Sequence, residues 1–189
     1  MILLIDNQDS FTYNLFHGIE RLGRSCVIVQ AKDADIELVR QLAPSGLILS
    51  PGPGNPSQAH QAAKLVQSFY ATLPILGVCL GHQIIGDCFG ASWGVSKEPT
   101  YGKATEIHHQ GKRIFDGLSQ PMVAARYHSL ALHSLPKDFE ALAWSSSGEL
   151  MAMGHRTKPV YGIQFHPESF LSPEGLDLLG QFCKECDVY

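Results

Sequence analysis

A cysteine lies between two glycines in the segment Gly77–Gly81 (GVCLG), directly after the apolar run Ile75–Val78 and before a helical pattern. This spacing matches the G-x-S-x-G nucleophile elbow, with Cys79 in place of the serine. The glycines permit a sharp turn, and the following helix directs the positive end of its dipole at the sulfur, which favours the thiolate. A lone cysteine is more often an inert core residue, but this position between a strand and a helix favours a nucleophile.

A thiol nucleophile requires a base, and the base requires a group that orients it. The segment Phe165–Glu168 (FHPE) offers both at the end of the apolar run Val160–Phe165, with His166 as the base and Glu168 as the orienting carboxylate. The chain contains nine histidines, and any one of them taken alone is more often a surface or core residue. The pairing with Glu168 at the end of a predicted strand is what distinguishes His166.

A loop rich in proline and glycine, Pro51–Pro56 (PGPGNP), follows the predicted strand Gly46–Leu49. The carboxyl ends of parallel strands share one edge of a sheet, so this loop can reach the same place as Cys79. Gly52 has a backbone N–H that can face a developing oxyanion, and the amide of Leu80 would be the second donor. Taken alone, the loop is more often an ordinary tight turn.

No metal or cofactor site is predicted. Cys183 and Cys186 have the spacing of a zinc-ligand pair, but no second pair lies nearby in the sequence. The segment Gly77–Gly81 lacks the third glycine and the lysine of nucleotide-binding loops. We therefore expect chemistry that uses side chains and backbone amides alone.

The elements that must position these residues alternate, in the first half of the chain, between short apolar runs and helical patterns. This alternation is typical of βαβ units on a parallel sheet. The expected strands there are Ile2–Ile5, Cys26–Val29, Gly46–Leu49 and Ile75–Val78. Asp9 or Ser10 is expected to cap the helix that follows the first strand.

The second half of the chain contains short β-rich segments separated by turns, which predicts hairpins and some antiparallel pairing. These segments are Thr105–His108, Met122–Arg126, Glu140–Trp144, Leu150–Met153 and Val160–Phe165. A last helix is expected with Pro173 in its first turn. The predicted fold is α/β, with an open, mostly parallel twisted sheet flanked by helices and some antiparallel additions, in a single domain over residues 1–189.

The composition excludes several classes of protein. Of 189 residues, 44% are apolar and 17% are charged, and the net charge is −4 without a cluster of lysine and arginine. Nucleic acids and anionic membrane surfaces are therefore not expected as partners. No apolar run approaches the roughly 20 residues of a membrane span. Five scattered cysteines do not suit a disulfide framework, so a cytoplasmic protein is expected.

Five ordered motifs carry a resemblance to a known family. They are Leu4–Leu15 (LIDNQDSFTYNL), Ser50–Pro56 (SPGPGNP), Pro74–Gln83 (PILGVCLGHQ), Arg126–Leu130 (RYHSL) and Gly162–Ser169 (GIQFHPES). Together they resemble the triad glutamine amidotransferases, the class I glutaminases, whose fold is flavodoxin-like. The first motif and Arg126–Leu130 resemble in particular the branch that contains the small subunits (component II) of anthranilate synthase and aminodeoxychorismate synthase.

The resemblance implies a role for each site residue. Cys79 would attack the side-chain amide of L-glutamine, His166 would transfer a proton to the leaving ammonia, and Glu168 would orient His166. The implied oxyanion donors are the amides of Gly52 and Leu80. The implied substrate-binding residues are Gly52, Gly54, Gln83, Ser129 and Leu130. No cofactor is implied.

The resemblance also implies that ammonia passes to a separate, chorismate-binding synthase subunit (component I). Nothing in the chain is suited to bind chorismate, and no phosphoribosyltransferase segment follows, so a free-standing subunit is expected. The implied partner-contact residues are Ser10, Tyr13, Asn14, Tyr101 and Lys103. Two positions depart from the branch, because Gln8 stands where tyrosine is usual and Tyr101 where histidine is usual. The second departure concerns docking or activation and leaves the triad intact.

Two other functions stay open at this point. A stand-alone cysteine hydrolase, such as a γ-glutamyl peptidase, could use the same elbow, although Gln83 and Ser129–Leu130 favour free glutamine over a peptide. A non-catalytic binding module that kept the fold conflicts with the intact triad. The sequence does not decide between the two synthases, although the Ser50–Pro56 motif favours anthranilate synthase.

Overall fold

The computed structural model describes residues 1–189, and its nine strands form one sheet in the order β2-β1-β3-β4-β9-β8-β7-β5-β6. The strands are β1 (Ile2–Asp6), β2 (Cys26–Gln30), β3 (Gly46–Leu49), β4 (Ile75–Val78), β5 (Trp93–His109), β6 (Met122–Leu132), β7 (Phe139–Ser145), β8 (Leu150–His155) and β9 (Val160–Ile163). The helices are α1 (Thr12–Arg21), α2 (Ile36–Leu42), α3 (His60–Phe69), α4 (Leu80–Cys88) and α5 (Gly175–Val188). None of these helices combines the length and the hydrophobicity that a membrane-spanning helix needs.

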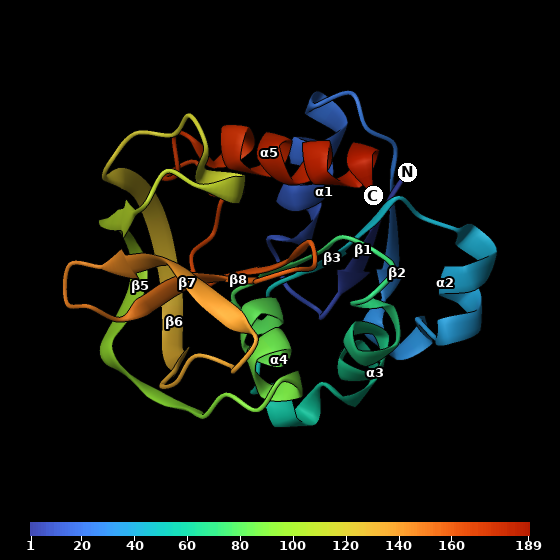
Figure 1. Ribbon diagram of the computed structural model, residues 1–189, viewed down its shortest axis with the longest axis horizontal. Coiled ribbons are helices and arrows are strands. Elements are labelled where there is room, and N and C mark those ends of the chain that lie inside the picture. Colours follow the sequence, from blue (N-terminus) through green and yellow to red (C-terminus); the bar gives the residue numbers. More distant parts are fainter.

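Strands β2, β1, β3, β4 and β9 run parallel, and helices cover both faces of this part of the sheet. Figure 1 shows α1 and α5 over one face, and α3 and α4 against the other. In β1, Leu4 belongs to the core beneath α1 and α5, whereas Leu3 and Ile5 belong to the core beneath α3 and α4. This burial on both faces explains the continuous apolar runs and confirms the predicted fold class.

The carboxyl ends of the parallel strands meet at one edge of the sheet. The first residues beyond β1, β3, β4 and β9 are Asn7, Ser50, Cys79 and Gln164. The strand order reverses between β1 and β3, and crevices for ligands form outside the carboxyl ends at such a switch point. Four segments that are far apart in the sequence therefore converge where the predicted chemistry lies.

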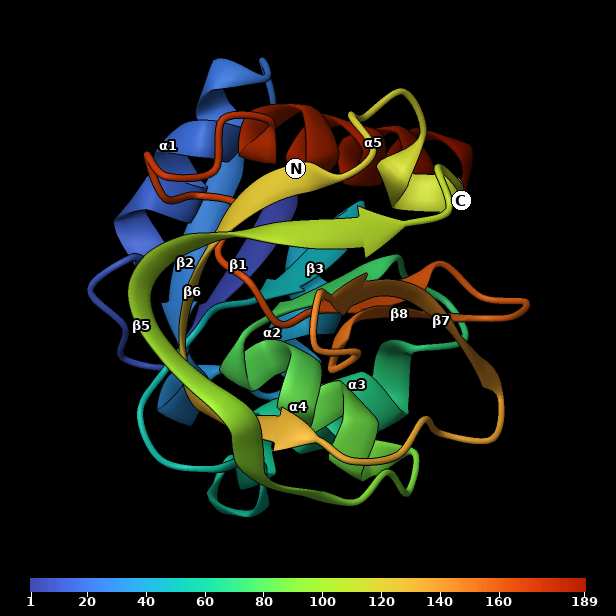
Figure 2. The same cartoon turned by 90° about the vertical axis from the view of Figure 1, so that its left-hand side faces the viewer.

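Strands β8, β7, β5 and β6 extend the sheet in antiparallel fashion, which confirms the predicted hairpins. Figure 2 shows β5 as a long, strongly curved strand. The predicted segment Thr105–His108 is only its end. The earlier part was missed because Pro99 and Gly102 resemble turn residues, and the ladder to β6 indeed shifts register at two places there.

The start of α1 differs from the prediction. Neither Asp9 nor Ser10 is the N-cap, because the helix begins at Thr12 and is preceded by Phe11 without a side-chain cap. The carboxylate of Asp9 instead accepts from the amide of Phe11 at 2.8 Å. The turn is organised by Asp6 at the end of β1, whose Oδ1 accepts from the Thr12 hydroxyl at 2.7 Å.

Helix α5 returns the chain to the opposite edge of the sheet, at the amino ends of the parallel strands. It begins at Gly175, so Pro173 precedes the helix and does not lie in its first turn. Near its end, Cys186 packs against Gly46, the first residue of β3. Both chain termini lie on this side of the molecule, away from the edge where the loops converge (Figure 1).

Candidate active site

Cys79 lies at the sharp turn between β4 and α4, with backbone angles of φ 53° and ψ −103° that residues with a side chain rarely adopt. Its amide donates to the carbonyl of Ile163 in β9 at 2.8 Å, and its carbonyl accepts from the amide of Gln83 at 3.1 Å. The turn is therefore held from both sides. Its geometry is that of a nucleophile elbow, in which a strained turn presents the side chain to a cavity at the strand end.

The glycines that flank the nucleophile are required by close packing. A Cβ atom on Gly77 would lie 2.3 Å from the carbonyl oxygen of Gly81, and one on Gly81 would lie 2.5 Å from the carbonyl oxygen of Leu49. Helix α4 can begin directly against β3 and β4 only because both positions lack a side chain.

His166 and Glu168 lie together just beyond β9. The distance from Nδ1 of His166 to Oε1 of Glu168 is 2.7 Å, and both side chains are buried. An ionised carboxylate only accepts hydrogen bonds, so Nδ1 carries the proton. The other ring nitrogen, Nε2, is buried without a protein hydrogen-bond partner and is left for the thiol or its substrate.

The surroundings favour a protonated His166. Burial lowers the pKa of this residue, but the neighbouring Cys79 sulfur and the Glu168 carboxylate raise it, and the net shift is upward. The rings of Phe11 and Tyr127 lie edge-on to the imidazole, with centroid distances of 5.5 and 5.0 Å. They shield the site from water, so the charges interact more strongly there than at the surface.

The loop that carries the imidazole is braced from two sides. The Ser172 hydroxyl donates to the carbonyl of His166 at 2.6 Å and accepts from the amide of Ala125 in β6 at 2.9 Å. On the other side α5 begins against the loop, because a Cβ atom on Gly175 would lie 1.8 Å from the carbonyl oxygen of Pro167. The position of the base is therefore set by β6 and α5 as well as by β9.

The predicted oxyanion loop is packed between β1 and Leu80. A Cβ atom on Gly52 would lie 2.5 Å from the carbonyl oxygen of Asn7 and 2.9 Å from Cδ2 of Leu80. Asn7 fixes the loop through two hydrogen bonds of 2.8 Å, from its amide to the Ser50 hydroxyl and from its side chain to the Ser50 carbonyl. Gly54 has a φ of 83°, a left-handed conformation that favours glycine.

The predicted oxyanion and substrate-binding residues line one cavity of about 210 Å³, together with Cys79. Pro53, Tyr101, Tyr127 and His128 complete its wall. The structure thus brings together residues from the loops after β3 and β4 and from strands β5 and β6.

The side-chain amides of two glutamines, Gln83 and Gln164, link Cys79 to this wall through hydrogen bonds. Nε2 of Gln83 donates to the carbonyl of Leu130 and to Oε1 of Gln164, both at 3.0 Å, and Nε2 of Gln164 donates to the Cys79 sulfur at 3.6 Å. Both amide protons of Gln83 are used, so its Oε1 is left as an acceptor. Gln164 was missed in the sequence, where a glutamine between apolar residues just before His166 is the available signal.

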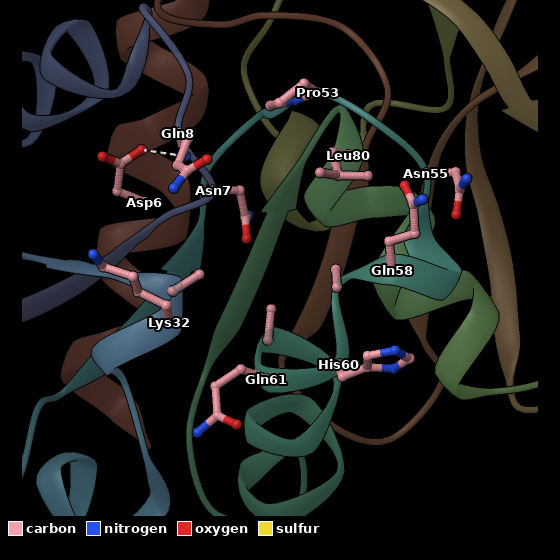
Figure 3. A pocket seen from close by; sticks show the side chains of 13 residues that line it. Asp6, Asn7, Gln8, Lys32, Pro53, Asn55, Gln58, His60, Gln61 and Leu80 are labelled. Atoms are coloured by element: carbon pink, nitrogen blue, oxygen red, sulfur yellow. Dashed lines mark hydrogen bonds between the residues drawn. The ribbon is translucent and has the colours of Figure 1, made fainter.

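A second cavity of about 340 Å³ lies on the other side of Pro53 and Leu80. Figure 3 shows the polar side chains around it, which include Lys32 and His60. It contains no thiol and none of the imidazole–carboxylate pair. The thiol of Cys79, which is the candidate nucleophile, lines the smaller cavity instead.

Comparison with known proteins shows the family to which the chain is related. The family described as glutamine amidotransferase class-I matches residues 3–186. The chain belongs to this family. The predicted family and fold are thereby confirmed.

Three proteins illustrate how close this amidotransferase is to others. The aminodeoxychorismate/anthranilate synthase component 2 of Bacillus subtilis is 42% identical over 184 residues, which cover 96% of this chain and 95% of that protein. The aminodeoxychorismate synthase component 2 of Serratia marcescens is 44% identical over 188 residues, which cover 96% and 98%. The crystal structure of a proposed GMP synthase component from Thermoplasma acidophilum has a TM-score of 0.89 and 30% identity, covering 100% of this chain and 94% of that one.

The partner-contact residues predicted for this amidotransferase all lie on its surface. They are Ser10, Tyr13, Asn14, Tyr101 and Lys103. Phe170, which follows the His166 loop, was not among the predicted residues and is 88% exposed.

Replacing Gly175 by alanine should disturb the base. The new Cβ atom would collide with the carbonyl of Pro167, so we expect Gly175→Ala to lower the free energy of unfolding by about 2 kcal/mol. It should also lower turnover, because the loop must move. Gly180→Ala on the same helix is the control, since its Cβ would meet Leu22 at an ordinary 3.5 Å. Equal melting temperatures for the two variants would contradict this account.

Replacing the sulfur should change the titration of His166. Cys79→Ser removes one of the groups that raise the pKa of His166, so the ring should lose its proton at lower pH in this variant. Because the pKa of His166 is higher in the folded than in the unfolded protein, its protonation stabilises the fold at pH values below the unfolded pKa, near 6.5. This stabilisation is lost as the pH rises through the folded pKa. Histidine signals followed by NMR against pH measure the change. Identical titration of His166 in both proteins would be the contrary result.

Proposed function

We propose that this chain hydrolyses L-glutamine to glutamate and ammonia and delivers the ammonia to a chorismate-using synthase subunit. The observation that carries the proposal is the strained backbone of Cys79, which lines a cavity together with Gly52, Leu80 and Gln83. The buried His166–Glu168 pair supports it. The relatives from Bacillus subtilis and Serratia marcescens are component 2 proteins of such synthases. The five cysteines are all unpaired, which suits the cytoplasm.

The reaction begins when the sulfur of Cys79 attacks the side-chain amide carbon of glutamine. The negative charge that develops on the amide oxygen is stabilised by the backbone amides of Gly52 and Leu80. His166 gives its proton to the leaving nitrogen, which departs as ammonia and leaves a thioester. His166 then takes a proton from water, which attacks the thioester and releases glutamate. Glu168 holds the imidazole in the orientation that both steps need.

The far end of glutamine is held by the opposite wall of the cavity. Oε1 of Gln83 has no proton to donate, so it is suited to accept from the α-ammonium group. The backbone of Ser129 and Leu130 lines the same side of the cavity and offers further polar groups. Gly54 lines the same cavity beside the oxyanion loop, where its φ of 83° favours glycine.

The partner subunit docks over the mouth of the site in this proposal. Tyr13 on α1 and Tyr101 on β5 are 62% and 64% exposed, and Phe170 is 88% exposed beside the triad loop. Large exposed aromatic residues are typical anchors of protein interfaces. Ser10, Asn14 and Lys103 provide the polar surroundings. No comparison favours a stand-alone γ-glutamyl peptidase.

The division of labour can be tested with Cys79→Ala in the assembled complex. The variant should lose glutamine-dependent synthesis of the aromatic product but keep synthesis from added ammonium salt, because the product is made entirely in the synthase subunit. Cys88→Ala is the control and should keep both activities. Loss of both activities in an intact Cys79→Ala complex would refute the proposal.

Docking can be tested with two residues of equal exposure. Phe170→Ala should weaken binding of the synthase subunit by about tenfold or more, as removal of an aromatic anchor does. Val188→Ala is the control, because Val188 is also 88% exposed but lies at the end of α5, on the opposite edge. Titration calorimetry with the synthase subunit gives both affinities. An unchanged affinity for Phe170→Ala would place the interface elsewhere.

A further inference from the structure

The segment Ser129–Leu130 lies where the ladder between β5 and β6 is interrupted. Leu130 pairs with Val95, but the next pair joins His128 to Thr100, so no residue of β5 stands opposite Ser129. The sheet therefore does not hold this segment as it holds the rest of β6. Something else must fix it if it is to bind a substrate.

A buried ion pair lies behind this interruption. Arg126 in β6 is 1% exposed and Glu149, just before β8, is 5% exposed, and Nη2 of Arg126 lies 3.0 Å from Oε2 of Glu149. Glu149 also accepts from the Ser96 hydroxyl at 2.9 Å and the Lys97 amide at 3.0 Å. Arg126 also donates to the carbonyl of Glu98 at 3.2 Å. The pair thus holds the part of β5 that leaves the ladder.

Arg126 also determines which nitrogen of His128 carries the proton. Nε of Arg126 lies 3.0 Å from Nε2 of His128, and a guanidinium can only donate, so Nε2 must accept. The proton of the neutral ring is then on Nδ1, which donates to the carbonyl of Leu130 at 2.9 Å. Burial, together with the charge of Arg126, lowers the pKa of His128 to about 4, which keeps the ring neutral.

The Leu130 carbonyl therefore accepts two hydrogen bonds, from Nδ1 of His128 and from Nε2 of Gln83. Gln83 continues the chain of contacts to Gln164 and so to the sulfur of Cys79. A continuous series of hydrogen bonds runs from the buried ion pair to the wall of the cavity. No hydrogen bond joins His128 to the triad, so its action on the chemistry is indirect.

We propose that His128, held by the buried Arg126–Glu149 pair with its proton on Nδ1, is a positioning residue that sets the Ser129–Leu130 and Gln83 wall for the substrate. This inference rests on the proposed function, in which that wall binds the α-amino acid end of glutamine. Where the ladder of β5 and β6 is interrupted, the side chains of Arg126, His128 and Glu149 hold the backbone in place, and none of them takes part in the reaction itself.

Two substitutions of His128 separate positioning from simple packing. In His128→Asn the amide nitrogen can replace Nδ1 and donate to Leu130, but Arg126 loses its acceptor. In His128→Gln the amide oxygen can replace Nε2 and accept from Arg126, but the donor to Leu130 is lost. The two variants therefore keep opposite halves of the network.

We expect His128→Gln to raise KM for glutamine by about tenfold or more with a much smaller change in kcat, because a buried carbonyl loses a donor. His128→Asn should stay within about threefold of the wild-type KM but melt at a lower temperature, because it leaves a buried donor unpaired. The rate at which iodoacetamide alkylates Cys79 should be equal in all three proteins. The measurements use the full chain with its synthase subunit bound.

The inference would be overturned if both variants changed KM and melting temperature to the same extent. An unchanged KM in His128→Gln would overturn it as well. Nitrogen NMR of the ring gives an independent answer, since a proton on Nε2 of His128 would also overturn it. If the wild-type protein released no ammonia from glutamine, the proposed function would fail. Hydrolysis by the wild type with an unaffected His128→Gln would remove the positioning role alone.

Discussion

The backbone of Cys79 is held in a conformation that costs about 1–3 kcal/mol for a residue with a side chain, and the surrounding structure offsets this cost. The cysteine cannot relax, because its amide donates a hydrogen bond to β9. In addition, the flanking glycines allow α4 to pack closely against β3 and β4. Several features depend on this one turn. It places the sulfur at the carboxyl end of β4, starts α4 at the next residue, and so keeps the Leu80 amide beside the sulfur.

Strand β9 is where the two halves of the sheet join. It pairs in parallel with β4 and antiparallel with β8, so Cys79 belongs to one half, Ser129 and Leu130 belong to the other, and His166, which follows β9, contacts both. The hydrogen bond from Gln83 to Leu130 connects the halves directly beside the cavity. The cavity is therefore lined by residues of both halves.

The parts that could be predicted from the sequence are those with a local signal. Continuous apolar runs marked the parallel strands, and Gly77 and Gly81 marked the elbow, because both features repeat a spacing that the backbone itself requires. Asn7 gave no such signal and Gln164 gave only that of a polar residue between apolar ones, since both act through contacts with residues far away in the chain. The prediction that Asp9 or Ser10 caps α1 was wrong, because Asp6 organises the turn before this helix from the end of β1.

The register interruption in β5 shows a second limit of sequence reasoning. Pro99 and Gly102 read as the end of a strand, yet the strand continues on both sides of them. What compensates is the pair of Arg126 and Glu149, which are more than twenty residues apart. A tertiary contact thus decides whether a local break in pattern ends an element or only bends it.

The side on which the chain starts and stops has a consequence for how such enzymes can be assembled. Both termini emerge at the amino ends of the parallel strands, and the loops that carry the chemistry lie at the carboxyl ends (Figure 1). A second enzyme joined covalently to either terminus would therefore leave the mouth of the cavity open. In this fold, a domain fused to either terminus and a separate protein bound over the cavity would therefore occupy different surfaces.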